Sequence, residues 1–152
     1  MIHAIKYQGN KELAIFLGEL FAYDLLNDGV MSDIDVIIPI PLHSKKLKQR
    51  GYNQSEYLGK GVSNKLNKPL ITDILLKAKE TGTQTKLKKF ERWENVGKVF
   101  EISNELLLEN KHVLLVDDVI TTGATLEAAS QRLLQIKGLK LSIAALAFAP
   151  KR

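Results

Sequence analysis

The residues best suited to chemistry lie in one segment, Val113 to Thr125, which reads VLLVDDVITTGAT. An aliphatic run leads into two adjacent acids, Asp117 and Asp118, which can accept hydrogen bonds from vicinal sugar hydroxyls and stabilise positive charge. The next residues form a turn with backbone N–H groups and hydroxyls at the start of a predicted helix, where the helix dipole favours a phosphate. These turn residues are Thr121, Thr122, Gly123, Ala124 and Thr125. The segment therefore predicts a sugar-phosphate site.

Other classes of protein place aliphatic residues before acids, and the rest of the sequence argues against them. A P-loop ATPase needs Gly-x-x-x-x-Gly-Lys-Ser/Thr upstream, and that pattern does not occur. A phosphoacceptor receiver domain needs far more residues than follow Asp118. An ordinary buried strand that runs into a turn would explain the aliphatic residues. It would not explain two acids followed by three threonines and a glycine.

Composition predicts a single domain over residues 1–152. The chain has 152 residues, of which 45% are hydrophobic, and this is enough to bury a core without disulfides or structural metals. Cysteine is absent, which excludes disulfides, thiolate zinc sites and a cysteine nucleophile. The sequence has no apolar run of membrane-spanning length and no signal-peptide pattern, so we expect a soluble, cytoplasmic protein.

Positive charge is concentrated in the middle third of the chain. Between Lys45 and Lys98 there are 14 Lys and Arg against 5 Asp and Glu, whereas the rest of the chain has 8 against 12. A segment of this kind suits a polyanion, either a small molecule that carries pyrophosphate or a nucleic acid. A solvated basic surface is the alternative.

Alternating helices and strands must position these residues. Apolar residues at helical spacing predict a helix from Lys11 to Leu26, and Leu13, Phe16, Leu17, Leu20 and Phe21 are expected to cover the core. Asn53 and Glu56 resemble a capping box at the start of a second helix, and a third is predicted from Leu126 to Ile136. Aliphatic runs predict four strands, at Ile34–Ile40, Ile71–Leu76, Val113–Val116 and Leu141–Phe148.

This order of elements predicts an α/β fold with an open, mostly parallel sheet flanked by helices. A basic loop is expected before Asn53, and residues 77–98 are polar and aperiodic, which predicts a long loop that acts as a lid. Ligands of such sheets bind beyond the carboxyl ends of the strands. We therefore expect the loops at Pro39–His43 and Asp117–Thr125 to meet at one site.

The segment VLLVDDVITTGAT resembles the motif with which type I phosphoribosyltransferases bind 5-phosphoribosyl-1-pyrophosphate. Nearly the whole chain is similar to the ComF-like family of competence proteins, often catalogued as amidophosphoribosyltransferase-like. The matching pieces are IKYQGNKELA at 5–14, PIPLH at 39–43, RGYNQ at 50–54 and KETGTQTKLKKFERWENV at 79–96. The resemblance implies the type I phosphoribosyltransferase fold.

The resemblance also implies roles for individual residues. The Thr121–Thr125 turn would hold the 5-phosphate, and Asp117 and Asp118 would be the catalytic pair that binds the 2- and 3-hydroxyls of the ribose. The pyrophosphate loop would comprise Pro41, Leu42, His43 and Ser44. A flexible loop at 79–95 would close over the substrate, with Gln84 and Arg92 as its polar residues. Further positions that match the family pattern are Lys48, Arg50, Asn53 and Gln54.

By resemblance, the chain is expected to bind phosphoribosyl pyrophosphate with Mg²⁺ and to transfer the phosphoribosyl group to an unidentified base or amine. The magnesium ion would be held through the ligand rather than by a cage of protein side chains. The family's Cys-x-x-Cys zinc module is absent, and a chain without cysteine is not expected to hydrolyse glutamine. The alternative function is a non-catalytic accessory module in competence that binds phosphoribosyl pyrophosphate or single-stranded DNA. Competence proteins and a second copy of the chain are further candidate partners.

Overall fold

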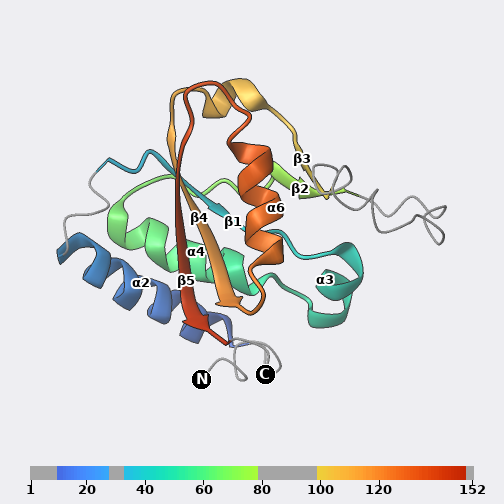
Figure 1. The fold of residues 1–152 in the computed structure, drawn as a ribbon. Helices are drawn as coiled ribbons and strands as arrows, with labels where there is room; N and C mark the ends of the chain where they lie inside the picture. Colours follow the sequence, from blue (N-terminus) through green and yellow to red (C-terminus); the bar gives the residue numbers. More distant parts are fainter. Residues whose placement is uncertain (1–9, 28–32, 79–98, 150–152) are drawn as a thin grey trace.

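The structure is a computed structural model that describes residues 10–27, 33–78 and 99–149. Its centre is a three-stranded parallel sheet in the order β1-β4-β5, and β2 and β3 form a separate antiparallel pair (Figure 1). The strands are β1 (Val36–Pro39), β2 (Leu75–Lys77), β3 (Phe100–Ile102), β4 (His112–Ile120) and β5 (Lys140–Phe148). The helices are α2 (Lys11–Asn27), α3 (Ser44–Arg50), α4 (Gln54–Leu66), α6 (Ala124–Leu133) and the 3₁₀ helix η2 (Glu105–Leu108). The predicted α/β class, with a parallel sheet flanked by helices, is confirmed.

Strand β1 and the first half of β4 are buried on both faces of the sheet, because their residues are aliphatic on both sides of the pleat. One face packs against α6, β3 and η2, and its core includes Ile38 and Leu115. The opposite face packs against α2 and α4, around Ile37 and Leu114. All four of these side chains are fully buried. Figure 1 shows the resulting layers, with α6 on one side of the sheet and the α2–α4 pair on the other.

Helices α2 and α4 cross at a contact between two glycines. A Cβ atom built on Gly18 would lie 2.2 Å from the carbonyl oxygen of Leu58, and one built on Gly61 would lie 2.0 Å from the carbonyl oxygen of Ile15. Only glycine fits at either position, because the obstacle in each case is backbone. The two helices therefore approach closely, and α4 is held firmly beneath the sheet.

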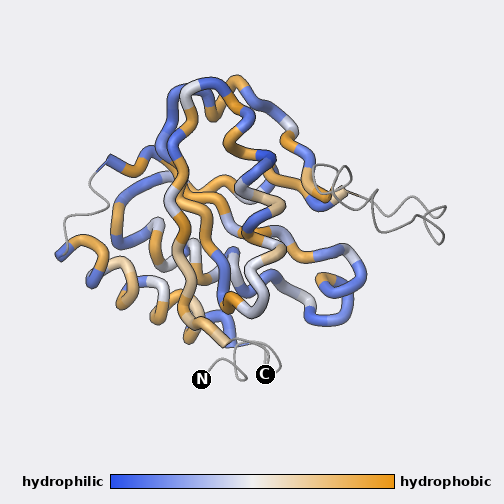
Figure 2. Tube along the Cα trace, viewed as in Figure 1, coloured by the Kyte–Doolittle hydropathy of each residue, from blue (hydrophilic) through white to orange (hydrophobic). Residues whose placement is uncertain are grey.

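This crossing changes which face of α2 is buried. The prediction that Phe16 and Leu20 cover the core is wrong, since they are 55% and 48% exposed. The buried residues of α2 are Ala14, Leu17, Gly18 and Ala22. A close helix crossing favours small side chains, so Phe16 and Leu20 lie on the outer surface instead. Figure 2 shows hydrophobic residues recurring along α2. The other three residues of the prediction, Leu13, Leu17 and Phe21, do pack against the core, so the spacing predicted the helix correctly and its packed face in part.

Several boundaries differ from the sequence prediction. Strand β4 does not end at Asp117 but continues to Ile120, because β5 runs alongside it for its full length. Of the predicted strand Ile71–Leu76, only Leu75 and Leu76 lie in a strand, β2, which pairs with β3 instead of joining the sheet. Leu70, just before the predicted strand, forms an isolated parallel bridge with Ile37. The predicted basic loop forms the helix α3. Helix α6 ends at Leu133, three residues before the predicted Ile136.

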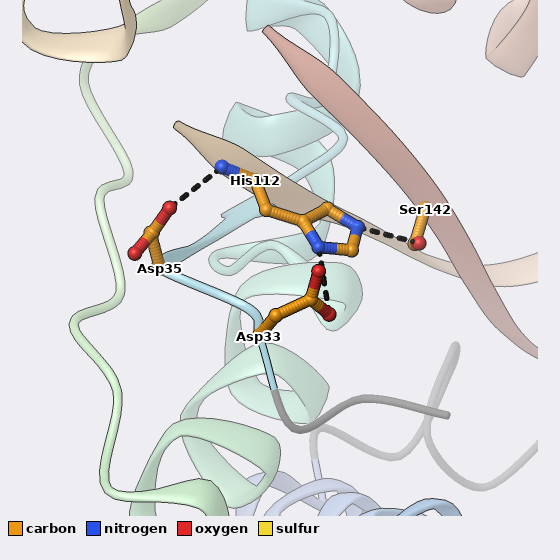
Figure 3. Close-up of polar contacts among 4 residues, drawn as sticks. All are labelled: Asp33, Asp35, His112 and Ser142. Atoms are coloured by element: carbon orange, nitrogen blue, oxygen red, sulfur yellow. Dashed lines mark hydrogen bonds and ion pairs between the residues drawn. The ribbon is translucent and has the colours of Figure 1, made fainter. Parts of the chain in front are cut away.

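The amino end of β4 is fixed by a polar network around His112 (Figure 3). The backbone N–H of His112 donates to Asp35 Oδ2 at 2.8 Å, and the backbone N–H of Asp35 donates to the carbonyl of His112 at 2.9 Å. The imidazole Nδ1 lies 3.1 Å from Asp33 Oδ1, and Nε2 lies 2.8 Å from Ser142 Oγ. These contacts join the segment before β1, the start of β4 and β5. Asp33, Asp35, His112 and Ser142 together form the His112 cluster.

Candidate functional site: the carboxyl end of the parallel sheet

Asp117 lies near the carboxyl end of β4 and is held by two hydrogen bonds. Its Oδ1 accepts from Ser55 Oγ at 3.0 Å and from the backbone N–H of Asp118 at 2.9 Å. Ser55 belongs to the first turn of α4, 62 residues away in the sequence. The candidate site is therefore built from the end of a strand and the start of a helix on a neighbouring layer.

The surroundings of Asp117 disfavour its charged form. Burial raises the pKa of the Asp117 carboxyl to about 6, and the nearby charge of Asp118 adds to the increase. The hydrogen bonds from Ser55 and from the Asp118 backbone act in the opposite direction, because they stabilise the carboxylate. Asp117 is consequently an acid that changes charge close to neutral pH, which is a common property of functional carboxyls.

Asp118 has a different environment. Its Oδ1 accepts the backbone N–H of Val119 at 2.8 Å. Its charge also raises the pKa of Tyr52, although the main cause of that increase is burial of the ring and Arg50 acts in the opposite direction. The sequence predicted Asp117 and Asp118 as an equivalent pair. The two carboxyls interact with each other, but only that of Asp117 also accepts a hydrogen bond from Ser55, so their environments differ.

The predicted phosphate turn follows directly after β4 and begins α6. Gly123 is the N-cap residue of α6 and has φ +79°, ψ −10°, the left-handed conformation that glycine adopts most readily. Its carbonyl accepts the N–H of Glu127 at 2.9 Å, which closes the first turn of the helix. The backbone N–H groups at the start of an α-helix have no intrahelical acceptor. Gly123 has no side chain that could cap the helix, and Thr122 Oγ1 accepts the N–H of Ala124, the first helical residue, at 3.4 Å. The next N–H groups of the turn can therefore face a ligand.

Asp117 and the turn line one surface pocket. Its walls are formed by Asp117, Val119, Ile120, Thr121, Thr122, Gly123, Ala124, Thr125 and Leu126. The structure therefore places one carboxyl, three threonines and the amino end of α6 around the same space. Asp118 is not among the residues that line this pocket. The arrangement offers N–H and hydroxyl donors on one wall and an acceptor on another.

The predicted pyrophosphate loop leaves the same edge of the sheet. Strand β1 pairs with β4 through Pro39 and Val116, and the N–H of Ile40 donates to the carbonyl of Val116 at 2.9 Å. His43 is the N-cap residue of α3, and its Nδ1 accepts the N–H of Lys45 at 3.3 Å. Ser44 is the first residue of that helix rather than a loop residue. Pro41, Leu42, His43 and Ser44 do not line the pocket, so the expected meeting of the two loops is not seen there.

The segment Tyr52–Ser55, which contains part of the RGYNQ match, is buried beside the site. Asn53 is the N-cap residue of α4, as predicted, and its side chain accepts the N–H of Ser55 at 3.2 Å while donating to the carbonyl of Ile40 at 3.0 Å. The ring of Tyr52 packs edge-on against Tyr57, and Lys11 Nζ lies 5.8 Å from its centroid. Sequence reasoning missed Ser55, although its position within a predicted helix cap was a usable signal.

The other predicted site residues can be placed in part. Lys48 and Arg50 belong to α3, and Gln54 is the buried first residue of α4. Gln84 and Arg92, with the predicted lid, lie outside the described residues. In the parts of the chain that the structure describes, no three His, Asp or Glu side chains are grouped so as to hold a metal ion. No helix in those same ranges has the length and apolarity to cross a bilayer.

The chain belongs to the phosphoribosyl transferase domain family, whose model matches residues 53–152. It is 30% identical over 138 residues to the DNA utilization protein YhgH of Escherichia coli strain K12, an alignment that covers 89% of this chain and 60% of that protein. It is 38% identical over 102 residues to competence protein F of Haemophilus influenzae, covering 65% of this chain and 44% of that protein. The chain thus spans about 60% or less of the length of these curated relatives.

Solved structures show the same fold at lower identity. An allosteric regulatory enzyme of purine biosynthesis superposes with a TM-score of 0.59 at 19% identity, covering 86% of this chain and 25% of that chain. A purine phosphoribosyltransferase from Pyrococcus horikoshii superposes with a TM-score of 0.52 at 22% identity, covering 93% of this chain and 75% of that chain. The fold is that of the type I phosphoribosyltransferases, in agreement with the sequence resemblance.

Proposed function

We propose that this chain binds 5-phosphoribosyl-1-pyrophosphate with Mg²⁺ and transfers its phosphoribosyl group to a base or an amine. The observation that carries the proposal is the shared pocket, in which the Asp117 carboxyl lines the same space as the Thr121–Thr125 turn. A sugar phosphate needs both the carboxyl and the turn. Its phosphate needs donors, and its ring hydroxyls need an acceptor.

The 5-phosphate is assigned to the turn. The left-handed Gly123 starts α6 and has no side chain to cap it, and Thr121, Thr122 and Thr125 are exposed at that helix end. Thr122 Oγ1 accepts one N–H of the turn, that of Ala124, at 3.4 Å. A helix amino end combines free N–H donors with a favourable dipole, and both stabilise a dianion. The phosphate would therefore anchor the ligand at the α6 end of the pocket.

The sugar is assigned to the acid pair. In the transfer, the bond from ribose C1 to the pyrophosphate oxygen breaks, pyrophosphate leaves with the electron pair, and C1 forms a bond to the acceptor nitrogen, which gives up its proton. Positive charge grows on the sugar before the new bond is complete. Carboxylates near the ring stabilise that charge more in the transition state than in the ground state. Because the pKa of Asp117 is about 6, its charge is available above that pH.

Magnesium is assigned to the ligand. When bound to a pyrophosphate, the ion offsets the negative charge that the leaving group gains, and it keeps several water ligands. A pocket lined by threonine hydroxyls fits such a hydrated complex. No residue of this chain is assigned as a ligand of the ion.

The proposal is tested by calorimetry and by pyrophosphate release. We expect binding of phosphoribosyl pyrophosphate that weakens when Mg²⁺ is removed, and release of pyrophosphate with at least one member of a panel of nucleobases and amines. Asp117→Asn and Asp118→Asn should each lower turnover about a hundredfold. Each should weaken ligand binding much less, because an amide still bonds sugar hydroxyls but carries no charge. Equal affinity with and without Mg²⁺ would contradict the proposal, as would turnover that survives both substitutions.

A second candidate is a non-catalytic module for handling DNA. The relatives are named as DNA utilization and competence proteins, and α3 favours a polyanionic partner. Four of its seven residues are basic, none is acidic, and none is buried. Binding of single-stranded DNA that weakens steeply with salt, together with no pyrophosphate release from the whole panel, would favour this candidate.

A further inference from the structure

Ser55 is a buried polar residue that links α4 to the candidate site. It is 4% exposed, and its hydroxyl donates to Asp117 Oδ1 at 3.0 Å. Two residues earlier, Asn53 donates to the carbonyl of Ile40 at the end of β1. The first turn of α4 is thus tied to the carboxyl ends of both β1 and β4. Neither Asn53 nor Ser55 belongs to the segment Val113–Thr125.

The geometry leaves the Ser55 hydroxyl available for this bond. Near a helix start, serine often uses its hydroxyl to cap backbone N–H groups. Here Asn53 already performs that role, since its side chain accepts the N–H of Ser55 at 3.2 Å. The hydroxyl is instead directed across layers to Asp117. Because α4 is locked against α2 at Gly18 and Gly61, the donor is presented from a rigid element.

We propose that Ser55 is a positioning residue that holds the Asp117 carboxylate in the orientation the sugar site requires, an inference that rests on the proposed function. The bond stabilises the ionised form of Asp117, because a hydroxyl that donates to a carboxylate favours the charged state. It also fixes one oxygen, which leaves the other available to a ligand in the pocket. Loss of the hydroxyl should therefore alter both the charge and the direction of the Asp117 side chain.

The charged neighbours of Asp117 show why this donor matters. Asp118 on the same strand opposes ionisation of Asp117. Arg50 at the end of α3 acts on Tyr52, and Lys11 of α2 stacks over the Tyr52 and Tyr57 rings. The two interactions that lower the pKa of Asp117 are the bond from Ser55 and the backbone N–H of Asp118. Of these two, only the Ser55 bond depends on a side chain.

The test compares Ser55→Ala and Ser55→Thr with the wild type. The titration of Asp117 is followed by carbon-13 NMR of its carboxyl, assigned with Asp117→Asn, and affinity for magnesium phosphoribosyl pyrophosphate is measured by calorimetry across the same pH range. We expect Ser55→Ala to move the Asp117 midpoint upward and to weaken ligand binding about tenfold at neutral pH, because a hydrogen bond to a charged group is lost. Ser55→Thr keeps a hydroxyl and should retain the wild-type midpoint.

Ser63→Ala is the matched control. Ser63 also lies in α4 and its hydroxyl donates to the carbonyl of Lys68 at 2.6 Å, so the variant loses a hydroxyl bond of the same helix away from the site. It should leave the Asp117 midpoint unchanged. If Ser55→Ala did not fold, Ser55→Cys would replace it, because a thiol is a weaker donor of similar size.

An Asp117 midpoint that is the same in wild type and Ser55→Ala would overturn the inference, as would an equal shift in Ser63→Ala. The NMR arm needs no ligand, so it separates this inference from the proposed function. A protein that binds no phosphoribosyl pyrophosphate but shows the Ser55-dependent midpoint would refute the function alone.

Discussion

The two ends of β4 use aspartates in opposite ways. At the amino end, acceptance of the His112 backbone N–H lowers the pKa of Asp35, and Lys111, Lys68 and His112 lower it further. At the carboxyl end, burial and the neighbouring Asp118 raise the pKa of Asp117 to about 6. The amino end thus stabilises a fixed negative charge. The carboxyl end keeps its acid poised to change charge.

The difference shows what separates a structural carboxylate from a candidate functional one. The His112 cluster pairs acids with donors and with a histidine, and it joins the segment before β1 to β4 and β5. The Asp117 site places two acids side by side and tolerates the cost of burying one. Residue type alone does not distinguish the two ends, since each has two aspartates close together in the sequence, Asp33 and Asp35 at one end and Asp117 and Asp118 at the other. The two ends are distinguished by the groups that contact each carboxyl.

The largest expected difference is the pH dependence of stability. The folded pKa of Asp117 lies above its unfolded value of 3.8, so the folded state binds the extra proton and its stability falls as pH rises from about 4 to about 6. The shift corresponds to about 3 kcal/mol. Asp117→Asn should remove this fall in the free energy of unfolding, measured by urea denaturation over that pH window.

Asp35 should behave in the opposite sense. Its folded pKa is lowered, so its contribution is present above the unfolded value of 3.8 and is lost as pH falls below it. Asp35→Asn should therefore change the acid limb of the stability curve and leave the window of Asp117 unaffected. If the free energy of unfolding depended on pH in the same way in Asp35→Asn and Asp117→Asn, the two ends of β4 would not differ in how they use their aspartates.

The second prediction separates stability from binding. His112→Ala removes the contacts to Asp33 and Ser142 and should destabilise the fold by about 2 kcal/mol. Affinity for magnesium phosphoribosyl pyrophosphate should stay at the wild-type value, because the cluster lies at the other end of the sheet. Ser142→Ala, which removes one of these contacts, should cost about 1 kcal/mol. Thermal melts and calorimetry on the same samples test both. A loss of affinity in His112→Ala would mean that the two ends are coupled.

The smallest expected effect is at Gly123. An alanine Cβ there would meet no atom within 4 Å, so the cost of Gly123→Ala comes from φ +79° and should be about 1 kcal/mol. Relief of that strain should rotate the N–H groups of the turn and weaken binding of the 5-phosphate. Gly51→Ala is the control, since Gly51 has φ +77° and equally open surroundings at the end of α3. Equal affinities in the two variants would move the phosphate site away from this turn.

Much of the fold was predictable because buried parallel strands and amphipathic helices have strong local patterns. The aliphatic runs before Pro39 and Asp117 predicted β1 and β4, and the apolar spacing after Asn53 predicted α4. Asp117 and the turn of the segment Val113–Thr125 do lie at a single pocket, and their roles toward a ligand remain predictions. These features depend on residues close together in the sequence.

The parts that could not be predicted depend on contacts between distant residues. The extension of β4 to Ile120 requires β5 beside it, and the exposure of Phe16 follows from a glycine contact with another helix. The link from Ser55 to Asp117 spans 62 residues. Helix α3 was missed because its basic residues lack an apolar face, and it is fixed by the His43 cap and the left-handed Gly51. The roles assigned to Pro41–Ser44 remain predictions.

The contact between Gly18 and Gly61 has a consequence for how this sequence can vary. A side chain at either position would meet the carbonyl oxygen of the other helix, and no second substitution can shrink a carbonyl. At most core positions a second mutation can compensate for a larger side chain. No such compensating mutation exists for Gly18 or Gly61, because the obstacle is backbone. In any descendant that keeps this crossing, both positions are expected to remain glycine. Selection of folded variants from a library randomised at Gly18 and Gly61 should return only glycine at both positions.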